Sequence, residues 1–436
     1  TTIEREVSLY AYYYYRLFQR AASIPLLYNS SAEGGNKGAM SRFMLQTLIE
    51  KDDLFTPGQK IDLRTFTTPS ETLAAQPISI PKDATVMQQL HDRFNDEHIL
   101  SPSAINTYMK CPLKFYLNYV AGLRPTNEVA DDVDNAMFGT LFHDAMHRLY
   151  QPYEKKPFRS DQVRALAQNE DLISQHLNNA FAVNFFHYPP NDSNGIPINY
   201  GTDRPLPLNG TGLINRHVIK QFIINQLNAD AQMAADLEHQ GGYWQIISQE
   251  GPYAIIHKLS AKTSRPSTLK LGGIIDRLDL LSSPLGDRIR IVDYKTSSIP
   301  HSANTLADLF DPDKCTQNYH MMQALYYCKV LAAPTSPYNG TPIPPALMYC
   351  AKNYGSNYSG IIKLTPPDNP KKAPIDDYKS QYDKDFTNLL AQKIDEIFTP
   401  YEADPDLGTF KQCADTQNCA HCDFLTFCLR HPQKTY

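Results

Sequence analysis

Two segments in the middle of the chain decide how we interpret it: residues 272–279 read GGIIDRLD, and residues 289–295 read IRIVDYK. In each segment an apolar run leads directly to an aspartate, Asp276 in the first and Asp293 in the second. Short apolar runs bounded by turn residues are typical of buried strands. We therefore expect two neighbouring strands, each of which carries its aspartate at the point where it leaves the core.

Lys295 follows Asp293 by two residues, so on a strand the two side chains share one face. Taken alone, this pattern fits an ordinary surface ion pair. With Asp276 on the neighbouring strand, it favours a compact site for a hard cation. Carboxylate oxygens suit Mg²⁺ or Mn²⁺, and the lysine can orient or activate water or balance phosphate charge.

The pattern of the remaining segments predicts an α/β fold in which a mixed sheet is flanked by helices. An amphipathic helix is expected over 135–150, and two mostly polar helical segments follow it. The helical segments are 161–182 and 213–240, the expected strands are 243–248, 253–259, 269–281, 288–294, 346–351 and 360–364, and the later helices are 316–331 and 376–398.

Asp276, Asp293 and Lys295 together resemble the active-site pattern of the PD-(D/E)xK nucleases. The forms GIIDRLD and DYKT are similar to those of the RecB-type branch of that superfamily. The resemblance implies a restriction-endonuclease-like sheet and Mg²⁺- or Mn²⁺-dependent hydrolysis of DNA phosphodiester bonds. It also implies an exonuclease domain of a DNA repair or recombination complex. A DNA-end-binding scaffold without catalysis is the alternative, and the three intact residues weigh against it.

Further residues match this family in the expected order. His143, in GTLFH, stands where the family carries a histidine metal ligand, and Gln323 and Tyr327 match a helix that helps place the substrate. The resemblance thus implies that His143, Asp276 and Asp293 hold the metal, with the Tyr294 carbonyl as a further ligand. It implies that Lys295 positions or deprotonates the attacking water. Arg277 is expected to touch a phosphate or to pair with an acid such as Asp279.

His143 also belongs to the run HDAMH, which mimics the zinc-protease motif HExxH. Asp144 occupies the position where that motif needs a glutamate as its base, and no third ligand lies nearby. We therefore favour the nuclease interpretation of His143, and expect His147 to have no functional role.

Four of the eight cysteines, Cys413, Cys419, Cys422 and Cys428, crowd the end of the chain. By themselves they could close a tetrahedral zinc site. The resemblance points instead to the iron–sulfur staple of AddB-type nuclease domains, a 4Fe-4S cluster in which Cys111 joins Cys419, Cys422 and Cys428. Cys413 is then not a ligand, and zinc is the alternative occupant. Three other cysteines in apolar surroundings are expected to be small core residues: Cys315, Cys328 and Cys350.

Several domains are expected along the chain. Residues 1–60 resemble the end of the helicase-like region of AddB-type subunits, 61–98 form a connector, and 99–436 form the nuclease domain. Within it, 151–240 is a helical insertion and 405–436 a cysteine-rich tail. The chain is then the C-terminal part of a longer subunit, with DNA and a helicase subunit or helicase-like region as partners. A glycine-rich loop at 33–38 lacks the Gly-Lys-Ser/Thr ending of a phosphate-binding loop, so we expect a plain turn.

The composition excludes some other classes. With 41 basic against 46 acidic residues, the net charge of −5 does not fit a general nucleic-acid coat protein, although it leaves a nuclease possible. No run approaches the roughly 20 apolar residues of a membrane span. The chain is too large and too poor in cysteine for an oxidised secreted scaffold, which predicts a reducing, cytoplasmic compartment.

Overall fold

The computed structural model describes residues 3–21, 23–28, 40–51, 61–66, 77–95, 97–124, 132–192, 195–202, 204–259, 268–296, 303–352, 360–365, 371–420 and 422–430. The chain divides into two compact units, Thr1–Ala74 and Ala75–Tyr436. The first unit contains α1 (Ile3–Phe18) and α2 (Arg42–Ile49), which meet through Tyr14 and Phe43. The glycine-rich loop at 33–38 lies outside the described residues.

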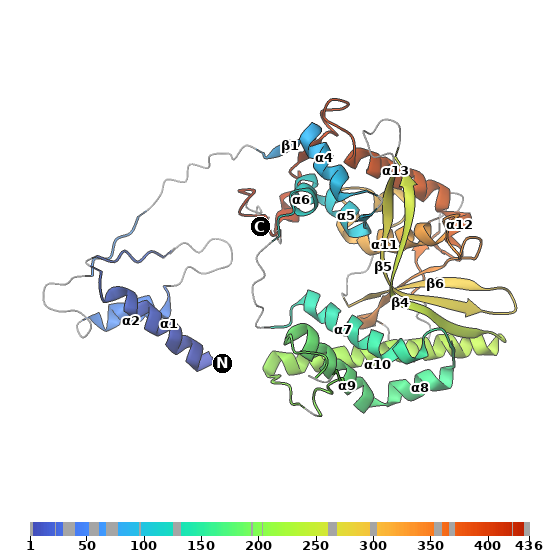
Figure 1. Cartoon of the computed structure of the whole chain (residues 1–436), viewed down its shortest axis with the longest axis horizontal. Coiled ribbons are helices and arrows are strands. Elements are labelled where there is room, and N and C mark those ends of the chain that lie inside the picture. Colours follow the sequence, from blue (N-terminus) through green and yellow to red (C-terminus); the bar gives the residue numbers. More distant parts are fainter. Residues whose placement is uncertain are drawn as a thin grey trace. The chain divides into compact units, whose positions relative to one another are not determined.

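The second unit is built on a mixed six-stranded sheet (Figure 1). Two strand pairs, β6–β7 and β2–β5, are parallel, and the other pairs of this sheet are antiparallel. Helices cover both faces, which confirms the predicted α/β fold. The strands in spatial order are β3 (Pro157–Phe158), β4 (Tyr243–Lys258), β5 (Thr268–Ser282), β6 (Arg288–Lys295) and β7 (Pro345–Tyr349), with β2 (Ile99–Leu100) also beside β5.

Two hydrophobic clusters occupy the two faces of this sheet, and β6 contributes to both. Ile291 packs in the first cluster, whereas Val292 and Tyr294 pack in the second. Successive side chains of a strand point to opposite faces, so Asp293 and Lys295 lie on the face of Ile291 and Tyr294 lies on the other. The first cluster contains α4 (Ala84–Arg93), α5 (Pro102–Lys110), α11 (Cys315–Leu331), α12 (Tyr378–Gln381) and α13 (Asp383–Ile397).

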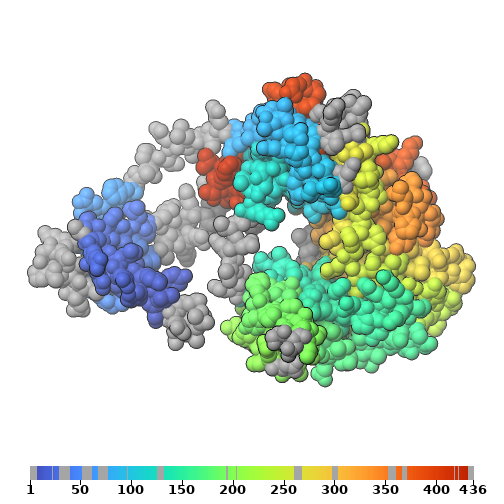
Figure 2. Space-filling view, viewed as in Figure 1, coloured from blue at the N-terminus to red at the C-terminus, as the bar shows by residue number. Residues whose placement is uncertain are grey.

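The segment 151–240 differs from our expectation of a mostly polar insertion. With α7 (Asn135–Tyr150) it covers one face of the sheet, and in Figure 2 its green surface lies across the yellow strands from the blue surface of α4 and α5. Its longest helix buries Ile219, Ile223 and Leu227, whose spacing marks a single apolar face. The helices of this segment are α8 (Ser160–Gln168), α9 (Glu170–Ala180) and α10 (Gly210–His239).

Part of the segment 61–98, which we expect to be a connector, packs in the second unit. There α4 buries Val86, Met87 and Leu90 in the core. The short strand β1 (Ser79–Pro81) pairs with β10 (Thr409–Lys411) of the cysteine-rich tail. This pairing ties the beginning of the second unit to its end.

Other elements follow the sequence closely. Ser101 caps α5 by accepting a hydrogen bond from the Ala104 N–H at 3.3 Å, and α5 ends at Lys110, just before Cys111. The helix expected over 135–150 has these bounds. Within the described ranges, no helix is long and apolar enough to cross a membrane. The remaining elements are α6 (Pro112–Phe115), η1 (Tyr116–Val120), η2 (Gln151–Tyr153), η3 (Phe181–Phe185), η4 (Ala307–Leu309), η5 (Cys350–Lys352), β8 (Lys363–Leu364), β9 (Ala373–Pro374) and η6 (Thr416–Cys419).

Candidate active site and cysteine cluster

The candidate site begins at a gap in the sheet. One edge of β5 pairs with β2 up to Leu271 and with β6 from Arg277 onward. Between them, residues 272–276 have no strand partner on this edge among the described residues. The Gly272 N–H instead donates to the Tyr326 hydroxyl of α11 at 3.0 Å. A side chain at Gly272 would place its Cβ 2.1 Å from the Tyr253 carbonyl oxygen of β4, so the close approach of two strands requires glycine here.

Asp276 and Asp293 lie where β5 and β6 separate, directly beyond their last pair, Arg277 with Val292. One oxygen of Asp276, Oδ2, accepts a hydrogen bond from the Tyr294 N–H at 2.9 Å and lies 3.5 Å from His143 Nδ1. Burial and the neighbouring Asp293 carboxylate raise the pKa of Asp276 to about 6. Of the predicted ligands, His143 of α7 thus contacts Asp276 of β5, and Asp293 of β6 lies beside Asp276.

Lys295 lies next to this acidic pair. Its Nζ is 2.6 Å from Asp293 Oδ2 and donates a hydrogen bond to Gln323 Oε1 at 3.1 Å. Burial opposes the charge of Lys295, but the Asp293 carboxylate outweighs it, and the pKa of the lysine is raised. The ammonium is thus held in place by β6 on one side and α11 on the other.

Helix α11 presents a row of polar side chains to the site. Gln323 and Tyr327 are four residues apart, and their side chains share a hydrogen bond. The Tyr327 hydroxyl packs so closely on β5 that a Cβ at Gly273 would lie 2.9 Å from it. One turn earlier, Tyr319 bonds to Ser103 at 2.8 Å, and the charges of Lys295 and Asp293 act on it. Sequence analysis missed Tyr319, although its spacing of four from Gln323 was a usable signal.

The acidic pair fits a divalent cation. Asp293 is only 2% exposed, and its Oδ2 lies 2.6 Å from the Lys295 ammonium. A buried carboxylate oxygen beside a second carboxylate is a suitable ligand for Mg²⁺ or Mn²⁺. Across the described part of the chain, however, no three or more His, Cys, Asp or Glu side chains are gathered closely enough to hold an ion.

The residues of the competing zinc-protease motif, HDAMH at 143–147, do not have the contacts that a protease site needs. Asp144, which would be its base, pairs with Arg148 at 2.9 Å and accepts a hydrogen bond from Asn184 at 2.7 Å. The carboxylate is therefore engaged elsewhere. His147 Nδ1 is buried and makes no hydrogen bond to a described residue.

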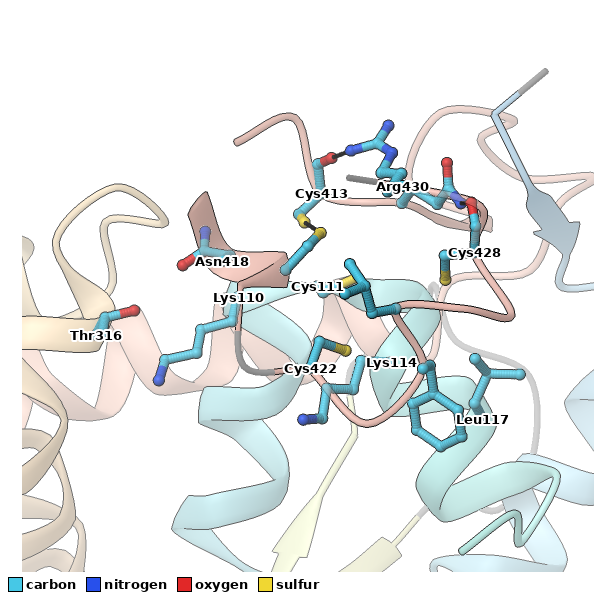
Figure 3. A pocket seen from close by; sticks show the side chains of 14 residues that line it. Lys110, Cys111, Lys114, Leu117, Thr316, Cys413, Asn418, Cys422, Cys428 and Arg430 are labelled. Carbon is cyan, nitrogen blue, oxygen red and sulfur yellow. Dashed lines mark hydrogen bonds between the residues drawn. The ribbon is translucent and has the colours of Figure 1, made fainter. Parts of the chain in front are cut away.

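The cysteines form a second constellation, around one cavity of about 260 Å³ (Figure 3). All four cysteines of the predicted staple line it, and so does Cys413, whose Sγ lies 3.7 Å from that of Cys419. A hydrogen bond from Cys413 lowers the pKa of Cys111 to about 6. Proximity therefore does not separate Cys413 from the predicted ligands. As predicted, three other cysteines are completely buried: Cys315, Cys328 and Cys350.

A comparison with known protein families gives one match. The family model described as the PD-(D/E)XK nuclease superfamily matches residues 99–429, which covers the site, the helices around it and the cysteine cavity. This chain belongs to the PD-(D/E)XK nuclease superfamily. Members of the superfamily are generally metal-dependent nucleases, and the mixed sheet with flanking helices agrees with their restriction-endonuclease-like fold. No curated protein matches the chain.

The structure decides between the two roles expected for Arg277 in this nuclease-family site. Arg277 is completely buried, so it cannot touch a phosphate of the substrate. It pairs with Asp279, as the alternative had it, and also with Asp230 of α10. Sequence analysis missed Asp230. A signal existed, because Asp230 lies at helical spacing within the apolar face of α10, where an acid needs a buried partner.

Proposed function

We propose that this member of the PD-(D/E)XK superfamily is a Mg²⁺- or Mn²⁺-dependent nuclease that hydrolyses DNA phosphodiester bonds. As in the RecB- and AddB-type enzymes it resembles, we propose an exonuclease domain that works in a DNA repair or recombination complex with a helicase. The observation that carries the proposal is the pair of the half-buried Asp276 and the buried Asp293, with Lys295 beside it, at the gap in the sheet.

Each side chain has a definable part in this reaction. Asp276, Asp293 and His143 would hold one or two ions, with the Tyr294 carbonyl as a further ligand. A bound divalent ion would supply stabilisation of charge on the phosphate and lower the pKa of the attacking water. Lys295 would hold that water and assist loss of its proton.

The α11 residues would act on the lysine and the substrate. Gln323 fixes the Lys295 ammonium by accepting its hydrogen bond at 3.1 Å. Tyr327, hydrogen-bonded to Gln323, keeps that amide oriented and presents its ring beside the gap in β5. This row supports a role for both residues in placing the DNA strand.

For the cysteine cavity we propose a 4Fe-4S cluster held by Cys111, Cys419, Cys422 and Cys428. The donor set supports this, because four thiolates are the ligands that such a cluster needs. A structural zinc ion, with Cys413 in place of Cys111, is the competing proposal. The contact of Cys413 with Cys419 supports the zinc proposal, which includes both residues as ligands.

The function is tested by degradation of end-labelled linear DNA in Mg²⁺ or Mn²⁺ by the parent protein and by Asp293→Asn. The variant keeps the shape of the side chain but loses its charge, so we expect cutting to fall at least about 100-fold. Asp287→Asn is the matched control, since Asp287 is exposed in the turn before the same strand and bonds only to Ser282 among the described residues.

Two results would count against the proposal. Equal cutting by the parent and Asp293→Asn would place the chemistry elsewhere. No cutting by a parent protein that circular dichroism shows to be folded, tested alone and with a helicase partner, would favour a DNA-end-binding scaffold.

A further inference from the structure

We infer that Asp230, on helix α10, is a positioning residue for the active site. Through Arg277 and Tyr294 it holds β5 and β6 in the arrangement that brings Asp276 and Asp293 together. The inference rests on the proposed function, because the group it positions is the proposed metal site. It gives the segment 151–240, which matched no functional motif in the sequence, a part in the reaction.

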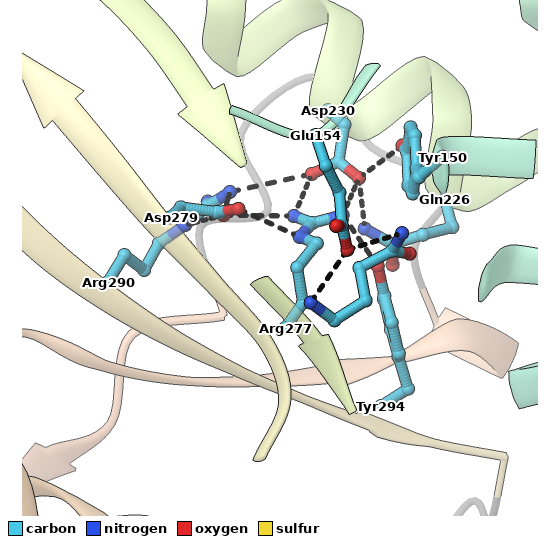
Figure 4. A network of polar contacts seen from close by, with 9 residues as sticks. Tyr150, Glu154, Gln226, Asp230, Arg277, Asp279, Arg290 and Tyr294 are labelled. Atoms are coloured by element: carbon cyan, nitrogen blue, oxygen red, sulfur yellow. Dashed lines mark hydrogen bonds and ion pairs between the residues drawn. The ribbon is translucent and has the colours of Figure 1, made fainter. Parts of the chain in front are cut away.

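Asp230 makes a two-pronged ion pair with Arg277 (Figure 4). The Arg277 Nη1 donates to Asp230 Oδ2 at 2.7 Å, and its Nη2 donates to Oδ1 at 2.9 Å. Both side chains are 0% exposed. Parallel hydrogen bonds of this kind fix the direction of the guanidinium as well as its distance.

The charges around this pair balance. Arg277 Nε lies 3.0 Å from Asp279, and Arg290 Nη2 lies 2.7 Å from Asp279 and 3.6 Å from Asp230. Two guanidinium groups therefore face two carboxylates. The rings of Tyr150, Trp244 and Tyr294 surround Arg277 with centroids 5.2–5.4 Å from its Cζ. Removal of Asp230 would leave a buried guanidinium with only part of its compensation.

This network lies directly behind the candidate site. Arg277 follows Asp276 on β5, and Tyr294 lies between Asp293 and Lys295 on β6. The Arg277 Nη1 donates to the Tyr294 hydroxyl at 2.5 Å, which joins the two strands just where their ladder ends. On the backbone side, the Tyr294 N–H donates to Asp276 at 2.9 Å. Tyr294 of β6 is thus bonded to β5 through both its hydroxyl and its backbone N–H.

The same carboxylate also reaches the helix that carries His143. Tyr150, two turns later on α7, donates its hydroxyl hydrogen bond to Asp230 Oδ2 at 2.8 Å. Asp230 therefore contacts α7 and β5 directly, and it reaches β6 both through Arg290 and, by way of Arg277, through Tyr294. These three elements carry every side chain proposed to hold the metal. Groups that orient metal ligands from behind commonly change metal affinity by about 10- to 100-fold when they are removed.

The test measures Mn²⁺ binding by calorimetry, without DNA, for the parent and three variants. Asp230→Asn removes the charge, and Tyr294→Phe removes only the hydroxyl that Arg277 bonds. The matched control is Asp236→Asn. Asp236 lies on the exposed face of α10 and accepts a hydrogen bond from Gln232, four residues earlier. On the buried face, Asp230 accepts one from Gln226 in the same arrangement.

We expect Asp230→Asn and Tyr294→Phe to weaken Mn²⁺ binding about 10- to 100-fold and Asp236→Asn to leave it within about twofold. Parent-like affinity in a folded Asp230→Asn and in Tyr294→Phe would overturn the inference. If Asp230→Asn does not fold, Tyr294→Phe decides. A parent protein that binds no Mn²⁺ would overturn the proposed function and the inference together, whereas a parent that binds Mn²⁺ with all variants unchanged would overturn the inference alone.

Discussion

Two lysines of the second unit, Lys295 and Lys82, show how the partner of a charge decides its state. Lys295 has a carboxylate 2.6 Å away, and its pKa is raised. Lys82 is completely buried, and its Nζ donates to the carbonyl oxygens of Glu396 and Leu407, each at 2.7 Å. Burial lowers the pKa of Lys82 to about 7, although the more distant Glu396 carboxylate opposes the shift. The first lysine is kept as an ammonium, whereas the second is poised to lose its proton.

Lys82 should therefore make stability depend on pH. Its folded pKa of about 7 lies below its ordinary value of 10.5, so between these values the unfolded chain binds a proton that the folded protein does not. Its contribution to the free energy of unfolding grows as pH rises through this window, by up to ~1.4 kcal/mol per pH unit, and is lost as pH falls towards 7.

The variant Lys82→Met lacks this titration. In urea unfolding at about pH 7 and about pH 9, we expect the stability of the parent relative to the variant to increase at the higher pH. A difference between the two proteins that stays constant over this range would contradict the depressed pKa.

At the scale of elements, α10 and the sheet are joined by charge as well as by apolar contact. Breaking a buried ion pair from one side leaves an uncompensated charge and costs about 3–5 kcal/mol, whereas replacing both partners by apolar residues is often close to neutral. The pair of Asp230 and Arg277 has the burial and the double hydrogen bond for which this contrast applies.

We expect Asp230→Leu to lower the free energy of unfolding by about 3–5 kcal/mol, and the double variant Asp230→Leu with Arg277→Met to regain most of that loss. Urea unfolding followed by circular dichroism measures both. If the inference about positioning holds, the double variant is stable but binds Mn²⁺ weakly. A double variant no more stable than Asp230→Leu alone would show that the unpaired charge of Arg277 is not the source of the loss.

At the scale of the whole molecule, the second unit is tied from its beginning to its end. The β1 strand pairs with β10 of the tail, and Cys111 shares a cavity with cysteines that begin 302 residues later, at Cys413. A cluster held by Cys111 and Cys419 would close a loop of some 308 residues around the nuclease core. In chain-entropy models, such a closure stabilises a fold by about 5 kcal/mol.

Comparison of Cys111→Ala with Cys413→Ala distinguishes the two metal proposals. For the 4Fe-4S cluster, we expect only Cys111→Ala to lose iron and visible absorbance. We also expect this variant to unfold at a clearly lower urea concentration, because its free energy of unfolding falls by about 5 kcal/mol. Loss of bound zinc and of stability only in Cys413→Ala would favour zinc and reject the cluster. Metal analysis and urea unfolding of the anaerobically purified proteins provide both readouts.

The local elements could be predicted because their patterns lie within a few turns of the sequence. An amphipathic run in the sequence predicts α7 at its observed bounds, 135–150. The order of strand and helix segments along the chain predicts the mixed sheet, and the apolar runs before Asp276 and Asp293 predict two of its strands. The family resemblance then added His143, Gln323 and Tyr327, and the structure brings all of them to the gap in that sheet.

What only the tertiary structure decided are the partners of buried charges and the part played by polar-looking segments. The sequence leaves Arg277 with two expected roles, a phosphate contact or a pair with a nearby acid such as Asp279. It does not predict the pair with Asp230 in the segment 151–240, because Asp230 is 47 positions away from Arg277. The residues next to an arginine in the sequence do not show whether its guanidinium faces DNA or a buried carboxylate. Sequence by itself determined the fold class and the acidic pair, because these depend on short-range periodicity. The contacts of Asp230, Arg277 and Tyr294 behind that pair depend on which distant groups meet once water is excluded.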